Sequence, residues 1–404
     1  MKRRTFLATA AAAMATPALG ADPPAPAGGV DIDFATWLAA FRGKALAAGL
    51  PAEVLDRELG DLAPDPRVRG ADRNQPEFSR PFSHYVKRAA GEDRAAIGRR
   101  RMAEIDADLG RIESAHGVPR EILVAIWGME SGYGASMGGQ DVMRSMATLA
   151  AEGRRRDFAE EQLIAALRIV ASGEWPRERL TGSWAGAMGQ TQFIPSNFVS
   201  LAIDADGDGR RDIWGSATDA LASAANLLAT AGWRRGEGWS IEVIAPEGFD
   251  FSVVETLRAT PAAWAGMGLA RADGAPLGAG AFEASLIAPT GYRGPLFLVL
   301  PNHFVIRRYN NAVTYAMAGG LLADRIAGRP GLVRDWPDET PLSLADRVAA
   351  QTALQAAGHD VGEPDGVIGL KTRAALRAWQ KARGLPADGY LSPEMIALLR
   401  APAA

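Results

Sequence analysis

The chain has 404 residues, of which 48% are hydrophobic and 23% charged, and its formal net charge at pH 7 is −3. A chain of this length is expected to form two or three domains. The acidic balance argues against a nucleic-acid partner, which would favour a basic surface. The sequence contains no cysteine, which excludes disulfides, thiolate metal sites and a lipid-anchor cysteine.

The first 20 residues are typical of an export signal. Three basic residues at positions 2–4 precede an apolar stretch at 6–15, and Ala18-Leu19-Gly20 fits a cleavage site. Arg3-Arg4 favours a twin-arginine signal, although an ordinary secretory signal with two arginines is the alternative. Residues 1–20 contain three basic and no acidic side chains, so their removal changes the net charge to −3 − 3 = −6. No apolar stretch is long enough for a transmembrane segment, and we expect a soluble periplasmic protein.

Proline, glycine and charge mark the expected domain boundaries. Residues 21–30 form a Pro/Ala/Gly-rich linker, and a second linker at 330–341 separates a large body at 31–329 from a small module at 342–402. The overall pattern predicts a mainly α (α+β) fold. Helices are predicted at 34–48, 51–59, 93–115, 119–131, 158–172, 216–231 and 311–327, and strands at 241–244, 286–288 and 296–300.

Glu130 completes a helix face that is otherwise apolar. The face consists of residues spaced at i, i+3, i+4 and i+7, namely Leu123, Ile126, Trp127 and Glu130. Gly132 and Gly134 are expected to end the helix directly after it. Burial and the negative end of the helix dipole both disfavour a charged carboxylate, so the pKa of Glu130 should rise towards the range of a general acid. The alternative is a helix-terminal glutamate that faces solvent.

A second segment, at 183–198, combines glycines, uncharged polar groups and aromatic rings. Its glycines would let the backbone approach a ligand closely, and Ser183, Gln190 and Gln192 offer hydrogen bonds without charge. Its aromatic rings provide flat apolar faces on which sugars stack. A structural turn is the alternative reading of this loop.

Further along, Tyr309, Asn310 and Tyr315 are expected at the start of a helix. From the residues alone, tyrosines at such positions belong more often to a core or an interface than to a binding site.

Four segments occur along the chain in a characteristic order. They are Asp72-Arg-Asn-Gln-Pro-Glu77 with Tyr85, the Glu130 helix, Ser183-Trp-Ala-Gly-Ala-Met-Gly-Gln-Thr-Gln-Phe-Ile-Pro195, and Arg308-Tyr-Asn with Tyr315. Together they resemble the lytic murein transglycosylase B family (membrane-bound lytic transglycosylase B-like) of peptidoglycan-cleaving enzymes. The resemblance covers residues 31–327, and it implies a lysozyme-like catalytic core with an extra helical lobe, a small β-containing lobe and a groove for glycan strands.

The resemblance implies a lyase that cleaves the N-acetylmuramic acid–β-1,4–N-acetylglucosamine bond and leaves 1,6-anhydro ends, with Glu130 as its single acid/base and with no cofactor for the chemistry. A hydrolytic muramidase and a non-catalytic peptidoglycan-binding scaffold are the alternatives. Peptidoglycan strands are the expected partner, and cell-wall synthesis or division proteins are a further class. An aromatic residue common in the family is replaced by Leu227, which removes one stacking contact. The substrate-binding residues predicted with the help of the resemblance are Ser183, Gln190, Gln192, Tyr309, Asn310 and Tyr315.

An acidic loop, Asp204-Ala-Asp-Gly-Asp-Gly-Arg-Arg-Asp-Ile-Trp-Gly215, matches the start of an EF-hand-type calcium loop. Gly215 stands where the pattern has a bidentate Glu, and the resemblance implies that the later Asp219 takes this part. An acidic turn without an ion is the alternative, and any calcium would be structural. The predicted ligands are Asp204, Asp206, Asp208, Arg210, Asp212 and Asp219.

The module at 342–402 resembles a peptidoglycan-binding domain of the three-helix type with two Asp-Gly turns, at 365–366 and 388–389. Leu354, Leu376 and Trp379 are expected to form its core. The sequence assigns no glycan-contacting residues to this module.

Overall fold

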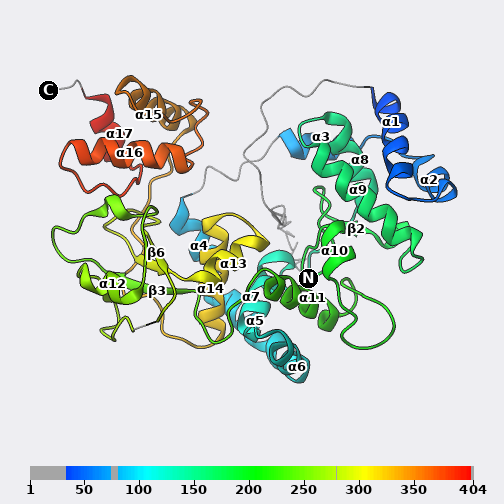
Figure 1. Ribbon diagram of the computed structural model, residues 1–404, viewed down its shortest axis with the longest axis horizontal. Coiled ribbons are helices and arrows are strands. Elements are labelled where there is room, and N and C mark those ends of the chain that lie inside the picture. The colour runs from blue at the N-terminus through cyan, green and yellow to red at the C-terminus, as the bar shows by residue number, and fades with distance from the viewer. Residues whose placement is uncertain (1–32, 74–80, 279, 402–404) are drawn as a thin grey trace, which may run out of the picture. The chain divides into compact units, whose positions relative to one another are not determined.

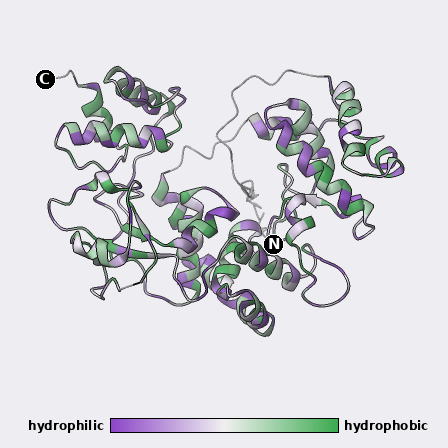
Figure 2. Ribbon diagram, in the orientation of Figure 1, coloured by the Kyte–Doolittle hydropathy of each residue, from purple (hydrophilic) through white to green (hydrophobic). Residues whose placement is uncertain are grey.

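The computed structural model describes residues 33–73, 81–278 and 280–401 (Figure 1). The predicted export signal and the linker at 21–30 lie outside these residues. The described residues form two compact units. The first comprises those within 1–74, 107–112 and 126–227, and the second those within 75–106, 113–125 and 228–404. Along the helices, hydrophobic and hydrophilic residues alternate (Figure 2). Within the described ranges, no helix combines the length and the apolar character that a bilayer crossing requires.

The first unit is built mainly from helices. Asp141 caps α8 by accepting the backbone N–H of Arg144 at 3.0 Å. Glu160 on α9 is a buried carboxylate that accepts the indole N–H of Trp37 at 2.8 Å and pairs with Lys44 at 2.5 Å, which ties α1 to α9. The elements of this unit are α1 (Phe34–Ala47), α2 (Ala52–Leu59), α3 (Pro66–Arg73), β1 (Gln140–Asp141), α8 (Val142–Glu152), α9 (Arg156–Ala171), η2 (Arg177–Arg179), β2 (Thr181–Gly182) and α10 (Pro195–Leu201). Three further helices have residues in both units: α6 (Asp106–His116), α7 (Arg120–Ser131) and α11 (Ala217–Thr230).

The second unit contains an antiparallel five-stranded sheet in the order β4-β6-β7-β3-β5. Every residue of strands β6 and β7 is buried, so both faces of these strands are covered. The residues of one face pack in a hydrophobic core that includes Trp264. The elements are α4 (Phe82–Ala89), α5 (Glu92–Glu104), β3 (Ser240–Ile244), η3 (Phe251–Val253), β4 (Arg258–Ala259), α12 (Pro261–Gly266), β5 (Ala270–Arg271), β6 (Ala284–Ile287), β7 (Leu296–Val299), α13 (Pro301–Tyr309) and α14 (Val313–Ile326), followed by the C-terminal helices α15 (Leu344–Ala356), α16 (Leu370–Ala382) and α17 (Pro393–Arg400).

The three C-terminal helices share one small core, in which Leu354, Leu376 and Trp379 are between 0% and 3% exposed, as predicted. This module contacts the sheet-containing part of the same unit. Glu255, in the loop before β4, pairs with Arg373 at 3.0 Å and with Arg377 at 2.9 Å, both on α16.

The prediction of a mainly α (α+β) fold is confirmed, with corrections to individual elements. The helix predicted at 93–115 is two helices, α5 and α6, separated at Ile105. The helix predicted at 311–327 begins at Val313 and is preceded by α13, so Tyr309 ends one helix instead of starting another. The prediction missed α3, α4, α8, α10, α12 and α13.

Candidate active site

Glu130 is buried at the C-terminal end of α7. Glu130 is 5% exposed, and the other residues of the same helix face, Leu123, Ile126 and Trp127, are at most 4% exposed. The predicted apolar stripe with one carboxylate is therefore present, and the alternative of a solvent-facing Glu130 is wrong. Its role in catalysis stays a prediction.

The backbone directly after α7 is left-handed at three successive residues. Gly132, Tyr133 and Gly134 have φ of +60°, +64° and +82°. A non-glycine residue in this region costs about 1–3 kcal/mol, and Tyr133 is held there by burial and by an edge-on ring contact with Trp127 at 5.7 Å. The strained residue thus lies three positions after the candidate acid.

Ser131 ties the end of α7 to the Gly/Gln loop. Its hydroxyl donates to the carbonyl oxygen of Gln190 at 2.6 Å and accepts the backbone N–H of Gly134 at 2.8 Å. The residue is 1% exposed, so both bonds are shielded from water. This connection holds the helix end that carries Glu130 against residues 183–192.

Ser183 follows β2 and lies at the start of that loop, 7% exposed. Its Oγ accepts the backbone N–H groups of Ala185 at 3.3 Å and Ala187 at 3.1 Å. Within the described part of the chain, the hydroxyl hydrogen donates to no group. Ser183 therefore keeps one hydrogen-bond donor for a ligand.

The amide groups of Gln190 and Gln192 are used within the first unit. Gln190 donates from Nε2 to the carbonyl oxygen of Trp214 at 3.2 Å. Gln192, at φ +52°, donates from Nε2 to the carbonyl oxygens of Met137 at 3.0 Å and Gly189 at 2.8 Å. Both glutamines hold the loop in place, which sequence reasoning had not indicated.

The remaining predicted substrate-binding residues belong to the second unit. Tyr309 ends α13, Asn310 is its C-cap and Tyr315 lies in the first turn of α14, and all three are at most 5% exposed. The Oδ1 atom of Asn310 accepts the backbone N–H of Ala312 at 3.1 Å. Its Nδ2 atom is buried and has no hydrogen-bond partner among the described residues, so it is a donor that a ligand could satisfy.

Three of the predicted calcium ligands come together. Asp204, Asp206 and Asp219 each place a carboxylate oxygen within 4.8 Å of the other two. Asp219 is 0% exposed, and burial raises its pKa from the ordinary value, with the charge of Asp206 acting in the same direction. Three carboxylates so close together fit a divalent cation with oxygen ligands, which would offset their repulsion.

The other predicted calcium ligands are not part of this group of three. Both backbone N–H groups of Trp214 and Gly215 donate to Oδ1 of Asp212, which therefore caps a turn. Asp208 accepts the backbone N–H of Arg210. Three of the six predicted ligands thus form one carboxylate group, and the roles of Asp208, Arg210 and Asp212 stay a prediction.

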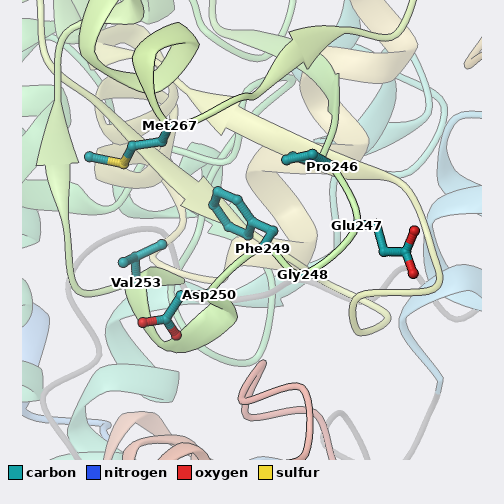
Figure 3. A pocket seen from close by; sticks show the side chains of 7 residues that line it. All are labelled: Pro246, Glu247, Gly248, Phe249, Asp250, Val253 and Met267. Carbon is teal, nitrogen blue, oxygen red and sulfur yellow. The ribbon is translucent and has the colours of Figure 1, made fainter.

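A pocket of about 410 Å³ lies in the second unit, on the loop after β3 (Figure 3). Its lining combines the ring of Phe249 and the side chain of Met267 with two carboxylates, Glu247 and Asp250. Asp250 pairs with Lys381 at 3.3 Å. None of the predicted site residues lines this pocket.

Ser131 and Tyr133 shape the backbone beside the candidate acid, and the sequence prediction did not include them. A signal was available for Ser131, because a hydroxyl residue follows the acid directly and precedes a glycine. For Tyr133 the signal was its place between two glycines, which marks a left-handed turn.

Comparison with known proteins decides the family. A model described as a transglycosylase SLT domain matches residues 33–324. The chain belongs to this transglycosylase family. A second model, for a peptidoglycan binding domain, matches residues 343–399. The resemblance to peptidoglycan-cleaving lytic transglycosylases, with a wall-binding module at the C-terminal end, is thereby confirmed.

The transglycosylase has similar proteins of known structure. It is 49% identical to SltB3 from Pseudomonas aeruginosa, solved in complex with NAG-NAM-pentapeptide, with a TM-score of 0.86 over 91% of this chain and 100% of that one. It is 28% identical to lytic transglycosylase Slt35 from Escherichia coli, solved in complex with calcium, with a TM-score of 0.60 over 77% and 96%. It is also 34% identical to membrane-bound lytic murein transglycosylase B from Escherichia coli over 232 residues, which are 54% of this chain and 60% of that relative.

Proposed function

We propose that this transglycosylase cleaves the bond between N-acetylmuramic acid and N-acetylglucosamine in peptidoglycan without adding water, and leaves 1,6-anhydro ends. The observation that carries the proposal is Glu130, a carboxyl that is 5% exposed at the end of an apolar helix face. An apolar environment favours the neutral carboxyl over the charged carboxylate, and the neutral form is the one that a general acid needs.

A single carboxyl can complete this reaction. Glu130 would donate its proton to the glycosidic oxygen as the bond from C1 to that oxygen breaks. It would then take a proton from the C6 hydroxyl of the same muramic acid, whose oxygen forms the new bond to C1. The acid is restored and no water is consumed.

The surrounding sequence agrees with one carboxyl. Hydrolysis of a glycoside usually needs two carboxylates at a set separation, and residues 183–198 contain no Asp or Glu. An internal hydroxyl that is already held near C1 replaces the second carboxylate, because the reaction becomes intramolecular.

Two of the proposed substrate-binding residues have hydrogen-bond donors that no described residue accepts. The hydroxyl hydrogen of Ser183 and the Nδ2 group of Asn310 have no acceptor among the described residues. Gln192 would contribute through its side-chain oxygen, since Nε2 already donates two hydrogen bonds. Gln190 donates one hydrogen bond from Nε2 and would contribute through its side-chain oxygen or its second N–H. Tyr309 and Tyr315 are included because their positions match the family pattern.

Analysis of the products tests the proposal. Purified sacculi are digested with the protein, and the released muropeptides are examined by mass spectrometry. Anhydro ends are expected. Products that have all gained a water would identify a hydrolytic muramidase, and wall binding without any soluble product would identify a non-catalytic scaffold.

Calcium is proposed to stabilise the fold and to take no part in the chemistry. The ion would be held by Asp204, Asp206 and Asp219, and its positive charge would offset the repulsion among these three close carboxylates. Support comes from their mutual distances, and the similar protein Slt35 has been solved with calcium.

The periplasm is the proposed location, supported by the signal-like residues 1–20 and by the wall-binding module at 343–399. Fractionation of cells that carry a tagged chain tests it, and recovery of the mature protein only in the cytoplasm would contradict it. Crosslinking in cells tests whether cell-wall synthesis or division proteins are partners.

A further inference from the structure

The first Asp-Gly turn of the C-terminal module is closed by a glutamine from α15. The N–H of Gly366 donates to Oε1 of Gln351 at 2.6 Å, and Oδ1 of Asp365 accepts the N–H of Val367 at 2.8 Å. The Nε2 group of Gln351 also donates to Oδ1 of Asp365 at 3.3 Å. All of these bonds use only one oxygen of the aspartate.

The second Asp-Gly turn is built in the same way on a glutamine from α16. The N–H of Gly389 donates to Oε1 of Gln380 at 2.8 Å, and Oδ1 of Asp388 accepts the N–H of Tyr390 at 2.9 Å. The Nε2 group of Gln380 donates to the same Oδ1 at 2.9 Å. The two turns are therefore structural equivalents within one module.

The second turn shows what such a turn binds with its other oxygen. Oδ2 of Asp388 accepts the backbone N–H of Tyr292, from the loop between β6 and β7, at 2.9 Å. The preceding Gly291 has φ +77°, and an L-configured Cβ there would lie 2.9 Å from Oδ2 of Asp388. The second turn thus accepts the main-chain N–H of Tyr292, and the residue before Tyr292 is a glycine in the left-handed conformation.

The first turn presents the same oxygen to solvent. Asp365 is exposed, and its Oδ2 has no hydrogen-bond partner in the described chain. Two exposed leucines belong to the same part of the module: the side chain of Leu344 lies next to Gly366, and Leu370 begins α16 four residues after Gly366. They are 59% and 68% exposed. The module therefore presents to solvent both a hydrogen-bond acceptor, Oδ2 of Asp365, and two apolar side chains, those of Leu344 and Leu370.

We propose that the Asp365-Gly366 turn, together with Leu344 and Leu370, binds the stem peptide of peptidoglycan by accepting one of its main-chain N–H groups. This inference rests on the proposed function, which makes peptidoglycan the substrate. A D-residue adopts positive φ without the clash that an L-residue suffers, and stem peptides contain D-residues, so they can present an N–H as Gly291 and Tyr292 do.

The exchange Asp365→Asn isolates the atom on which the proposal depends. Asparagine keeps Oδ1 for the internal bonds of the turn and replaces Oδ2 by an NH₂ group, which donates and cannot accept an N–H. Asp360→Asn is the matched control, since Asp360 is an exposed aspartate in the same loop whose Oδ1 caps the N–H of Gly362. Both exchanges are made in a Glu130→Gln chain so that the wall is bound without being cut.

Binding is measured by cosedimentation with two materials, intact sacculi and glycan strands from which an amidase has removed the stem peptides. Asp365→Asn should weaken binding to intact sacculi about tenfold, the usual order for a hydrogen bond to a charged group. It should leave binding to peptide-free strands unchanged, and Asp360→Asn should change neither. Leu370→Ser, which leaves the turn's hydrogen bonds intact, should also weaken binding to intact sacculi alone.

Two outcomes overturn the proposal. In the first, Asp365→Asn and Leu370→Ser both bind intact sacculi as tightly as the Glu130→Gln parent. In the second, binding falls equally on peptide-free strands, which would make the turn a glycan contact. The product analysis with Glu130 intact is independent of these measurements, so a failure of the stem-peptide site and a failure of the proposed activity are distinguishable.

Discussion

The packing of Tyr133 on Gly128 leads to a prediction about the turn that follows Glu130. A Cβ at position 128 would lie 2.5 Å from Cζ and 2.6 Å from Oη of Tyr133. Tyr133 is 4% exposed and packs edge-on against Trp127, so its ring has little room to retreat. Gly128→Ala should therefore displace Tyr133 and the left-handed turn that carries it.

Two opposing effects set the size of the change. Alanine is favoured over glycine inside a helix by about 1 kcal/mol, whereas overpacking a buried site costs about 1–3 kcal/mol. The free energy of unfolding should consequently fall by about 1 kcal/mol in Gly128→Ala. Gly43, in α1, is the matched control because nothing lies within 4 Å of its Cβ position. Gly43→Ala should raise the free energy of unfolding by up to about 1 kcal/mol.

Denaturant unfolding and turnover of purified sacculi are measured for both variants. Gly128→Ala should lose turnover as well as stability, since the displaced turn is bonded through Ser131 to the helix end that carries Glu130. Gly43→Ala should keep wild-type turnover. If the two variants are equally stable and equally active, the contact between Gly128 and Tyr133 does not constrain the site.

Three further predictions concern stability. Ser131→Ala removes one buried and one partly buried hydrogen bond and should cost about 2–4 kcal/mol in denaturant unfolding, whereas Ser200→Ala, at an exposed hydroxyl, should cost little. Burial lowers the pKa of His303 from 6.5 to about 3. Its contribution to the free energy of unfolding is therefore fully present above pH 6.5, where the side chain is neutral in both states, and is lost as the pH falls towards 3. Unfolding at pH 5 should show a loss of about 2 kcal/mol relative to pH 7 that His303→Phe abolishes. Chelation of calcium should lower the Tm of the wild type and of Asp208→Asn, and should leave Asp206→Asn unchanged.

Each of these has a contrary result. Equal stabilities of the two serine variants would mean that Ser131 does not hold the loop. A pH dependence that persists in His303→Phe would assign the loss to other groups. A Tm that does not respond to chelation in any of the proteins would contradict the proposed calcium site.

Most of the helices that the prediction missed are short. The helices α3, α4, α10, α12 and α13 have between six and nine residues each, so each offers few turns over which a helical period can be recognised. The α7 helix has an apolar stripe that ends in Glu130, and its glycines mark the end. The α8 helix is longer, but nine of its eleven residues are buried and only Arg144 and Glu152 are partly exposed, so its polar face is narrow. The break at Ile105 has no glycine or proline to announce it.

The site was predictable in composition but not in detail. The positions of Ser183 and Gln192 in a Gly/Gln loop could be found from the pattern. That Gln192 bonds to Met137, 55 residues away, depends on a tertiary contact that no local pattern encodes. In the acidic loop, backbone N–H groups of the loop itself are accepted by Asp204, Asp206 and Asp212 alike. The spacing rule identified the acidic residues, but the grouping of Asp204 and Asp206 with Asp219 depends on the folded loop.

The most direct test of the central claim is the product analysis of the chain with Glu130→Gln beside the unaltered chain, on the same sacculi. The unaltered chain should release muropeptides with anhydro ends, and the variant should release almost none while its unfolding transition and its binding to sacculi stay unchanged. Release of anhydro products by a folded Glu130→Gln variant at a rate near that of the unaltered chain would contradict the assignment of Glu130 as the acid and base.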